Sequence, residues 1–93
     1  MITIELEDHE ALVLFEFLAR EIDDRNGEQL AKTFVHPAEF WALNSLNCLL
    51  ERVLAEPFSP QYGELVAAAR KQVITQCDPE GTFGPIGGEP RQS

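Results

Sequence analysis

Prolines set the boundaries of the helices in the second half of the chain. In "HPAEFWALNSLNCLLERVLAE", residues 36–56, Pro37 suits the first position of a helix, and Pro57 follows the stretch, where a helix cannot continue. "FSPQYGELVAAARKQVITQ" repeats the arrangement, with Ser59 as its cap. Only "PFS" joins the two segments, and short connections favour antiparallel neighbours. We therefore expect two helices, over about 37–56 and 60–76, paired as an antiparallel hairpin.

The front of the chain predicts a strand followed by a helix. "MITIEL" alternates apolar and polar side chains, which is the period of a half-buried strand. Asp8 can cap a helix that runs from about residue 9 to 23 and stops in "DDRNG", where Gly27 can take a positive φ. A second short strand at "LAKTFV" would pair with the first, unless the first pairs with a copy in a second chain. We expect a mainly α fold of one strand and three helices, with a small α+β fold as the alternative.

The chain is long enough for one domain, which we place at residues 1–76. The remaining residues, 77–93, are rich in Gly and Pro, have no apolar period, and predict a flexible tail. A folded part of about 75 residues lies near the size at which a single core is enough, and small domains often add a second subunit. Dimerisation is therefore a reasonable expectation from size alone.

The first helix carries more apolar side chains than one buried face can hold. At 100° per residue, one broad arc is the predicted core. Its members are Ala11, Leu12, Leu14, Phe15, Leu18, Ala19 and Ile22. Val13 and Phe17 fall outside that arc, one turn apart. The helix over 37–56 also has apolar side chains outside its predicted core face, since Trp41 and Cys48 form a second stripe beside Arg52.

Two extra apolar stripes in so small a protein need a surface to cover them. A Phe side chain left in water forgoes about 1.5–3 kcal/mol of burial, and apolar patches on soluble proteins tend to mark contacts. The rest of the same chain, a second copy, or a different protein can supply the cover. We expect the second copy, because Trp and Arg are frequent interface anchors. The predicted interface residues are Val13, Phe17, Trp41, Cys48 and Arg52.

The charge of the chain limits its partners. Sixteen Asp and Glu residues face seven Lys and Arg, for a net charge of −9. A negative field repels phosphate backbones and anionic membranes, so we expect neither nucleic acid nor a membrane as partner. A basic protein would be attracted. We expect a cytoplasmic protein, because the sequence has no signal-peptide pattern and no apolar run of the roughly 20 residues that cross a bilayer.

Two glycine-containing stretches resemble ligand-binding loops but lack the residues that such loops need. With Gly27 at position six of a calcium loop, Ile22 would stand at position one and Thr33 at position twelve, so two required ligands are missing. "GTFGPIGG" has no Walker lysine and no helix after it to bind phosphate. We interpret the first stretch as a turn and the second as part of the tail.

The His and Cys residues do not form a reactive pattern. His9 and His36 have no second ligand at three- or four-residue spacing, so we expect a capping or surface role for each. Cys48 is expected to be partly buried and inert. We expect no catalytic residues, no cofactor and no metal. The predicted function is that of a non-enzymatic interaction protein acting as a homodimer. The alternative is an acidic inhibitor, immunity or antitoxin-type protein that binds a basic target.

Overall fold

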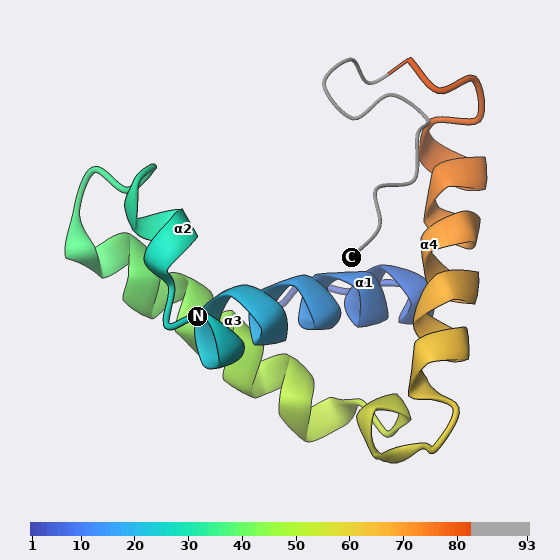
Figure 1. Ribbon diagram of the computed structural model, residues 1–93, viewed down its shortest axis with the longest axis horizontal. Helices are drawn as coiled ribbons and strands as arrows, with labels where there is room; N and C mark the ends of the chain where they lie inside the picture. Colours follow the sequence, from blue (N-terminus) through green and yellow to red (C-terminus); the bar gives the residue numbers. More distant parts are fainter. Residues whose placement is uncertain (83–93) are drawn as a thin grey trace.

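The computed structural model describes residues 1–82 and is mainly helical, without a strand in that range (Figure 1). Its elements are α1 (Asp8–Leu18), a π-helix η1 (Ala19–Asp24), α2 (Glu28–Ala31), α3 (Pro37–Val53), a 3₁₀ turn η2 (Glu56–Phe58) and α4 (Tyr62–Cys77). The expected tail falls for the most part on residues 83–93, which lie outside the described residues.

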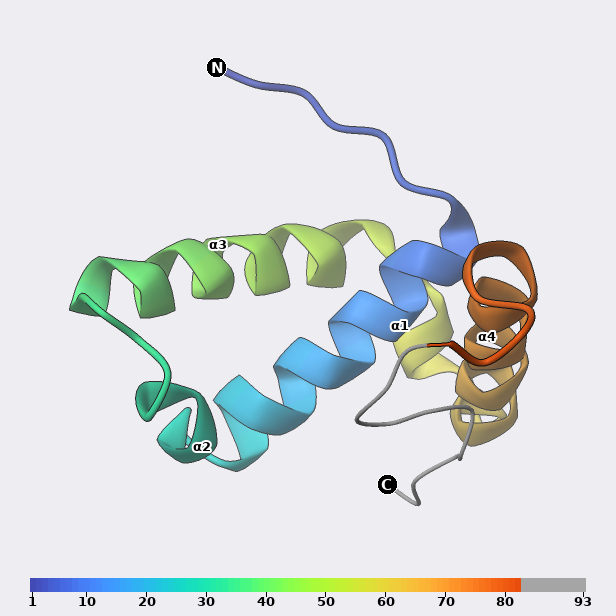
Figure 2. The ribbon, with the colours of Figure 1, turned by 90° about the horizontal axis from the view of Figure 1, so that it is seen from above.

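Helix α1 is the centre of the fold. Helix α3 packs against it obliquely, and α4 crosses its N-terminal part at a steep angle (Figures 1 and 2). The predicted antiparallel hairpin of the last two helices is wrong, because both pack mainly against α1. The chain leaves α3 at Leu54, whose backbone is extended, and η2 then leads to the start of α4. The first helical segment, α1 with η1, supplies five of the nine buried apolar residues, and α3 and α4 both pack against it.

The core is dominated by the first helical segment. Its buried apolar members are Ala11, Leu12, Phe15, Leu18, Ile22, Leu50, Leu54, Val66 and Ala69. The first five come from α1 and η1, two from α3 and its cap, and two from α4. The predicted core arc of the first helix is confirmed at these five positions. Leu14 is a correction, since it is exposed.

Acidic residues fix the start of α1. The helix begins at Asp8 itself, so Asp8 is not the cap; Glu7 takes that position. The backbone N–H of Glu7 donates a 3.0 Å hydrogen bond to Oε1 of Glu10. Carboxylates at this end also stabilise the helix through its dipole.

Two residues with left-handed backbone conformation end the first helical segment. Asn26 has φ 57° and Gly27 has φ 69°, as the turn chemistry predicted for Gly27. The Gly27 N–H donates to the carbonyl oxygen of Glu21 over 2.7 Å. A Cβ at Gly27 would stand 3.0 Å from the Phe40 ring. Glycine is therefore required here for both conformation and space.

Neither predicted strand forms within the chain. Residues 1–7, which we name the N-terminal arm, are exposed and leave the helical body in an extended course (Figure 2). "LAKTFV" instead ends α2 and turns, with the Thr33 hydroxyl donating to the Leu30 carbonyl over 2.8 Å. The alternation in the arm was real, but a strand also needs a partner backbone, and this turn removes the one expected.

The start of α3 confirms the capping role expected of His36. The backbone N–H of Ala38 donates to Nδ1 of His36 over 3.0 Å, and Pro37 occupies the first helical position. The helix ends at Val53, three residues before the predicted boundary. Local capping chemistry therefore set the beginning of α3 more closely than its end.

Candidate interaction surface

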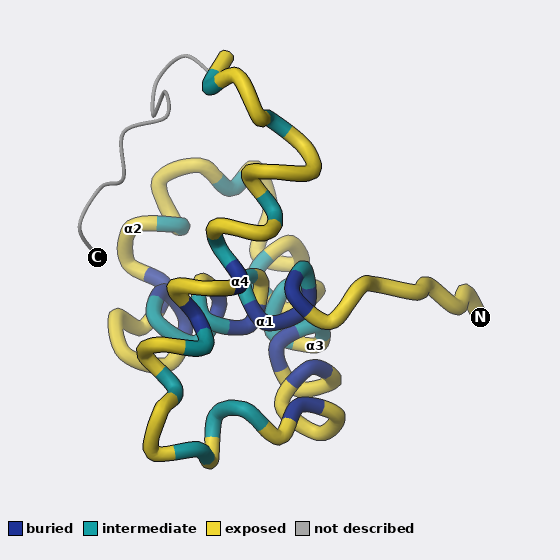
Figure 3. Tube along the Cα trace, turned by 90° about the vertical axis from the view of Figure 1, so that its right-hand side faces the viewer, coloured by how far each residue is buried: buried dark blue, intermediate teal, exposed yellow. Residues whose placement is uncertain are grey.

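The side of α3 that faces away from α1 is apolar and open. We name it the α3 outer face and define it by Trp41, Cys48, Leu49, Arg52 and Val53. Their spacing of seven, eight, eleven and twelve residues from Trp41 places all five on adjoining rows of one helix. Trp41 is 62% exposed, Leu49 55% and Val53 76%. In Figure 3, buried and exposed residues alternate along the trace of α3.

The opposite side of α3 explains why this face points outward. Leu50 is buried, and Leu43 and Leu46 pack against the core. Trp41 is also held in place, because its ring meets the edge of Phe40 at a centroid distance of 5.0 Å and an angle of 86°. Of the predicted interface residues, Trp41, Cys48 and Arg52 are thus exposed on one helix face. Cys48 had been expected to be partly buried, which is a correction.

The structure separates the other two predicted interface residues. Phe17 is 39% exposed, whereas Val13 is half-buried and packs against the core of its own chain. Leu14 is exposed near Phe17 in place of Val13. The guanidinium carbon of Arg20 lies 5.6 Å from the centre of the Phe17 ring, a cation–π arrangement. The first stripe is therefore reduced to a small patch at Leu14 and Phe17.

A chain of polar side chains connects α1 with α4. The Tyr62 hydroxyl donates to Oε1 of Glu16 over 2.8 Å, and Arg20 lies 3.3 Å from the other oxygen of Glu16. Arg20 and Arg25 also pair with Oε2 of Glu21, at 3.4 Å and 3.1 Å. Burial, and then the hydrogen bond to Glu16 and its negative charge, raise the pKa of Tyr62 well above its usual range. The arrangement holds two helices together and keeps the phenol protonated.

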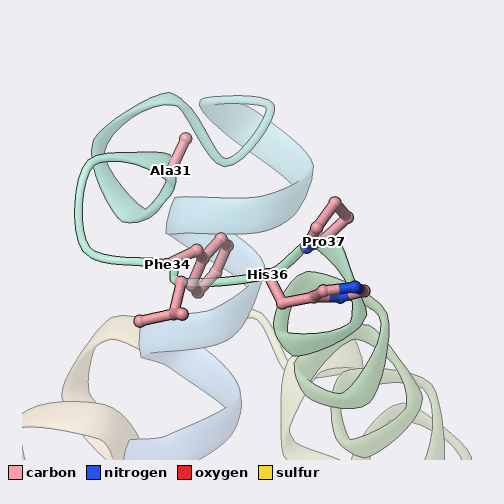
Figure 4. A pocket seen from close by; sticks show the side chains of 5 residues that line it. Ala31, Phe34, His36 and Pro37 are labelled. Carbon is pink, nitrogen blue, oxygen red and sulfur yellow. The ribbon is translucent and has the colours of Figure 1, made fainter.

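Two open pockets lie beside these features. One, of about 330 Å³, is lined by Glu16, Tyr62, Gly63, Val66 and Arg70. The second, of about 280 Å³, is lined by Ala31, Phe34, Val35, His36 and Pro37 (Figure 4). In the second pocket the His36 Nδ1 atom is engaged in the cap of α3, so the pocket offers mainly apolar contact area.

Sequence reasoning missed three buried polar residues, which are Glu21, described above with its arginine partners, Asn47 and His9. Asn47 is 2% exposed and donates from Nδ2 to both carboxylate oxygens of Asp23, at 3.3 and 3.4 Å, while its Oδ1 atom has no partner. His9 is buried, and its Nε2 atom lies 2.7 Å from Oε1 of Gln76 on α4. The signal for Asn47 was available, since it stands within the apolar arc of α3. His9 had been expected at the surface or in a cap.

Within residues 1–82, no three His, Cys, Asp or Glu side chains are grouped so that they could hold a metal ion. None of the helices in the described part of the chain has the length and apolarity needed to cross a membrane. No protein-family model, curated protein or solved structure matches the sequence or the fold.

Proposed function

We propose that the protein is a non-enzymatic interaction protein that acts as a homodimer through the α3 outer face. The observation that carries this proposal is the exposure of Trp41, Leu49 and Val53 on one side of a helix whose other side is packed. Burying each of these side chains is worth about 1.5–3 kcal/mol. Soluble proteins seldom leave such a row in water without a partner.

A second copy fits this face by symmetry. When two identical helices pack antiparallel about a two-fold axis, the same face serves both partners. An axis near Cys48, in the middle of the row, brings Trp41 of one copy toward Arg52 and Val53 of the other. The guanidinium can then lie against the indole, and the apolar side chains cover each other. We also propose a cytoplasmic location, which the free and exposed thiols of Cys48 and Cys77 favour.

The test is the mass in solution, measured by size-exclusion chromatography with light scattering at low and high salt. The expected result is a dimer that resists salt, because the contact is apolar. Leu49→Glu should give a monomer. Ile74→Glu is the matched control, since it makes the same kind of change at an exposed apolar position on α4. A monomeric wild-type chain at all concentrations, or a dimeric Leu49→Glu variant, would contradict the proposal.

The two cysteines give an independent readout of the same contact. The Cys77→Ser variant keeps Cys48, and mild oxidation should convert it to a covalent dimer. The Cys48→Ser variant keeps only the thiol of Cys77, at the end of α4, and should remain largely uncrosslinked. Equal crosslinking of the two variants would count against an axis near Cys48.

Binding of a basic protein is a second candidate, which the distribution of acids favours. Among the described residues, the acids of residues 5–28 that lie within ion-pair distance of Arg or Lys are Glu16 and Glu21. Most of this acidic segment is therefore available to a cationic surface. Such a complex would form quickly and weaken with salt. A pulldown repeated at low and high salt separates it from the salt-resistant dimer.

A further inference from the structure

The geometry points to a second contact in the homodimer: the N-terminal arms of two copies pair as an antiparallel two-stranded ribbon centred on Ile4. This inference rests on the homodimer proposed above and names the segment that completes its interface. The partner of the arm is the same arm of a second copy.

The arm is unpartnered from residue 1 to residue 6, up to the cap residue Glu7. Ile2 is 86% exposed and Ile4 76% exposed, and Leu6 is exposed as well. The backbone groups of residues 1–6 form no hydrogen bond with the rest of the described chain. An extended segment with free N–H and C=O groups is a template for another strand. Residues 1–82 offer none, because the segment expected to pair with the arm forms α2 and a turn.

The side chains of the arm suit a ribbon with one apolar face. Successive residues of a strand point to opposite sides. Ile2, Ile4 and Leu6 therefore share one side, while Thr3, Glu5 and Glu7 share the other. Two such arms bring six apolar side chains to a single face.

The sequence also selects one register. About a two-fold axis, antiparallel pairing of Ile4 with Ile4 places Ile2 opposite Leu6 and Thr3 opposite Glu5. Shifting the register by two residues toward the helix places Glu5 opposite Glu5, and like charges directly opposite each other are destabilising. A shift by one residue sets apolar side chains opposite acids. The register centred on Ile4 alone pairs all three apolar residues without an acid facing its copy.

The position of the arm fits the proposed dimer. Figures 2 and 3 both show the arm leaving the body on the side where α3 lies and extending away from it. Helix α3 has 17 residues, so one face about 25 Å long and about 10 Å wide offers on the order of 250 Å². Stable interfaces bury roughly 800 Å² per partner. The arm lies on the same side, and pairing of its exposed apolar side chains adds to the area that the α3 outer face buries.

Cysteine scanning tests the register in a Cys48→Ser, Cys77→Ser background whose dimeric mass is first confirmed by light scattering. In the proposed ribbon, the Cα atoms of two opposed residues lie about 4.5–5.5 Å apart, within reach of a disulfide. Mild oxidation of Ile4→Cys should therefore give covalent dimer. Thr3→Cys alone and Glu5→Cys alone place their thiols about 8 Å or more apart and should crosslink severalfold less. An equimolar mixture of Thr3→Cys and Glu5→Cys chains should crosslink as a heterodimer.

The outcomes separate this inference from the dimer on which it rests. A dimeric background in which the three single variants crosslink equally would overturn the ribbon and leave the α3 contact standing. A monomeric background would overturn both. Removal of residues 1–6 adds a check, because none of these residues belongs to the core cluster. The helical circular dichroism should stay unchanged while the dimer dissociation constant rises at least about tenfold.

Discussion

The hydroxyl of Tyr62, at the start of α4, donates a 2.8 Å hydrogen bond to the carboxylate of Glu16 on α1, across 46 positions of sequence. This bond and the contact between His9 and Gln76 mark two points at which α4 is tied to the central helix. His9 is buried, and Tyr62 and Glu16 are half-buried, whereas Gln76 is exposed. These polar contacts of α4 are therefore made with the helix that supplies the largest share of the buried apolar residues.

The phenol of Tyr62 should titrate well above its ordinary pKa of about 10. Burial raises the pKa most, followed by the hydrogen bond to Glu16 and its charge. The chain has one tyrosine, so the ultraviolet absorbance of tyrosinate reports Tyr62 alone. In the folded protein the absorbance should rise later than in the urea-unfolded chain. Glu16→Gln should move the midpoint part of the way back. Coincident curves for folded and unfolded chains would contradict this expectation.

The same shift sets a pH dependence of stability. Since the folded-state pKa of Tyr62 is raised, its stabilising effect is fully present below the unfolded value near 10 and is lost as pH rises through the folded value. Tyr62→Phe should lower the free energy of unfolding at neutral pH by about 1 kcal/mol. The difference between wild type and variant should shrink above pH about 10, as measured by urea unfolding at a series of pH values.

Gly27→Ala should destabilise the fold, whereas Gly63→Ala should not. A Cβ at Gly27 meets the Phe40 ring at 3.0 Å on a backbone with φ 69°, so a loss of about 1–2 kcal/mol is expected. Gly63 lies in α4 with nothing within 4 Å of an added Cβ. Alanine there should leave stability unchanged or raise it by up to about 1 kcal/mol. Thermal melts of the two variants give the comparison, and equal effects would count against the close contact at Phe40.

Replacing Asn47 by an apolar residue should stabilise the fold. Its buried Oδ1 atom has no partner, and Asp23, which accepts its amide protons, is exposed and can bond to water instead. Asn47→Leu should therefore raise the free energy of unfolding by about 1 kcal/mol. Asn47→Asp should do the opposite, with a loss of about 2 kcal/mol or more that recovers as acid protonates the new carboxyl. A destabilised Asn47→Leu variant would show that the amide makes a further essential contact.

Trp41 should report dimerisation through its fluorescence. It is the single tryptophan of the chain and is 62% exposed. If the α3 outer face is covered in the dimer, the emission maximum should move to shorter wavelength as protein concentration rises, and dilution should reverse the change. Leu49→Glu should hold the emission at the exposed position. Emission that stays constant while the mass doubles would place the interface elsewhere.

Local chemistry made part of the fold predictable. The pair His36 and Pro37 located the start of α3, and Gly27 located the turn after the first helical segment, because each depends on a few neighbouring atoms. The long apolar periods likewise predicted a mainly helical protein. These signals lie within one or two turns of chain and do not depend on how helices later pack.

The burial of particular faces was less predictable. Periodicity gives the angle of each side chain around α1, but the arc that is covered depends on where α3 and α4 lie. Leu14 and Val13 exchanged their expected roles for that reason. The π-helical turn adds a second cause, since its residues advance less around the axis and bring Glu21 inward. Of the candidate site, Trp41, Cys48 and Arg52 share an open face, while Phe17 stands apart from them.

The central place of α1 has a consequence for synthesis. Helix α1 leaves the ribosome before α4, yet part of its cover comes from α4, since His9 contacts Gln76 across 67 positions. Its apolar arc therefore stays partly uncovered until α4 has emerged, however early α1 itself forms. A nascent chain stalled before residue 62 would carry an open core, and the fold is completed only after translation has delivered α4.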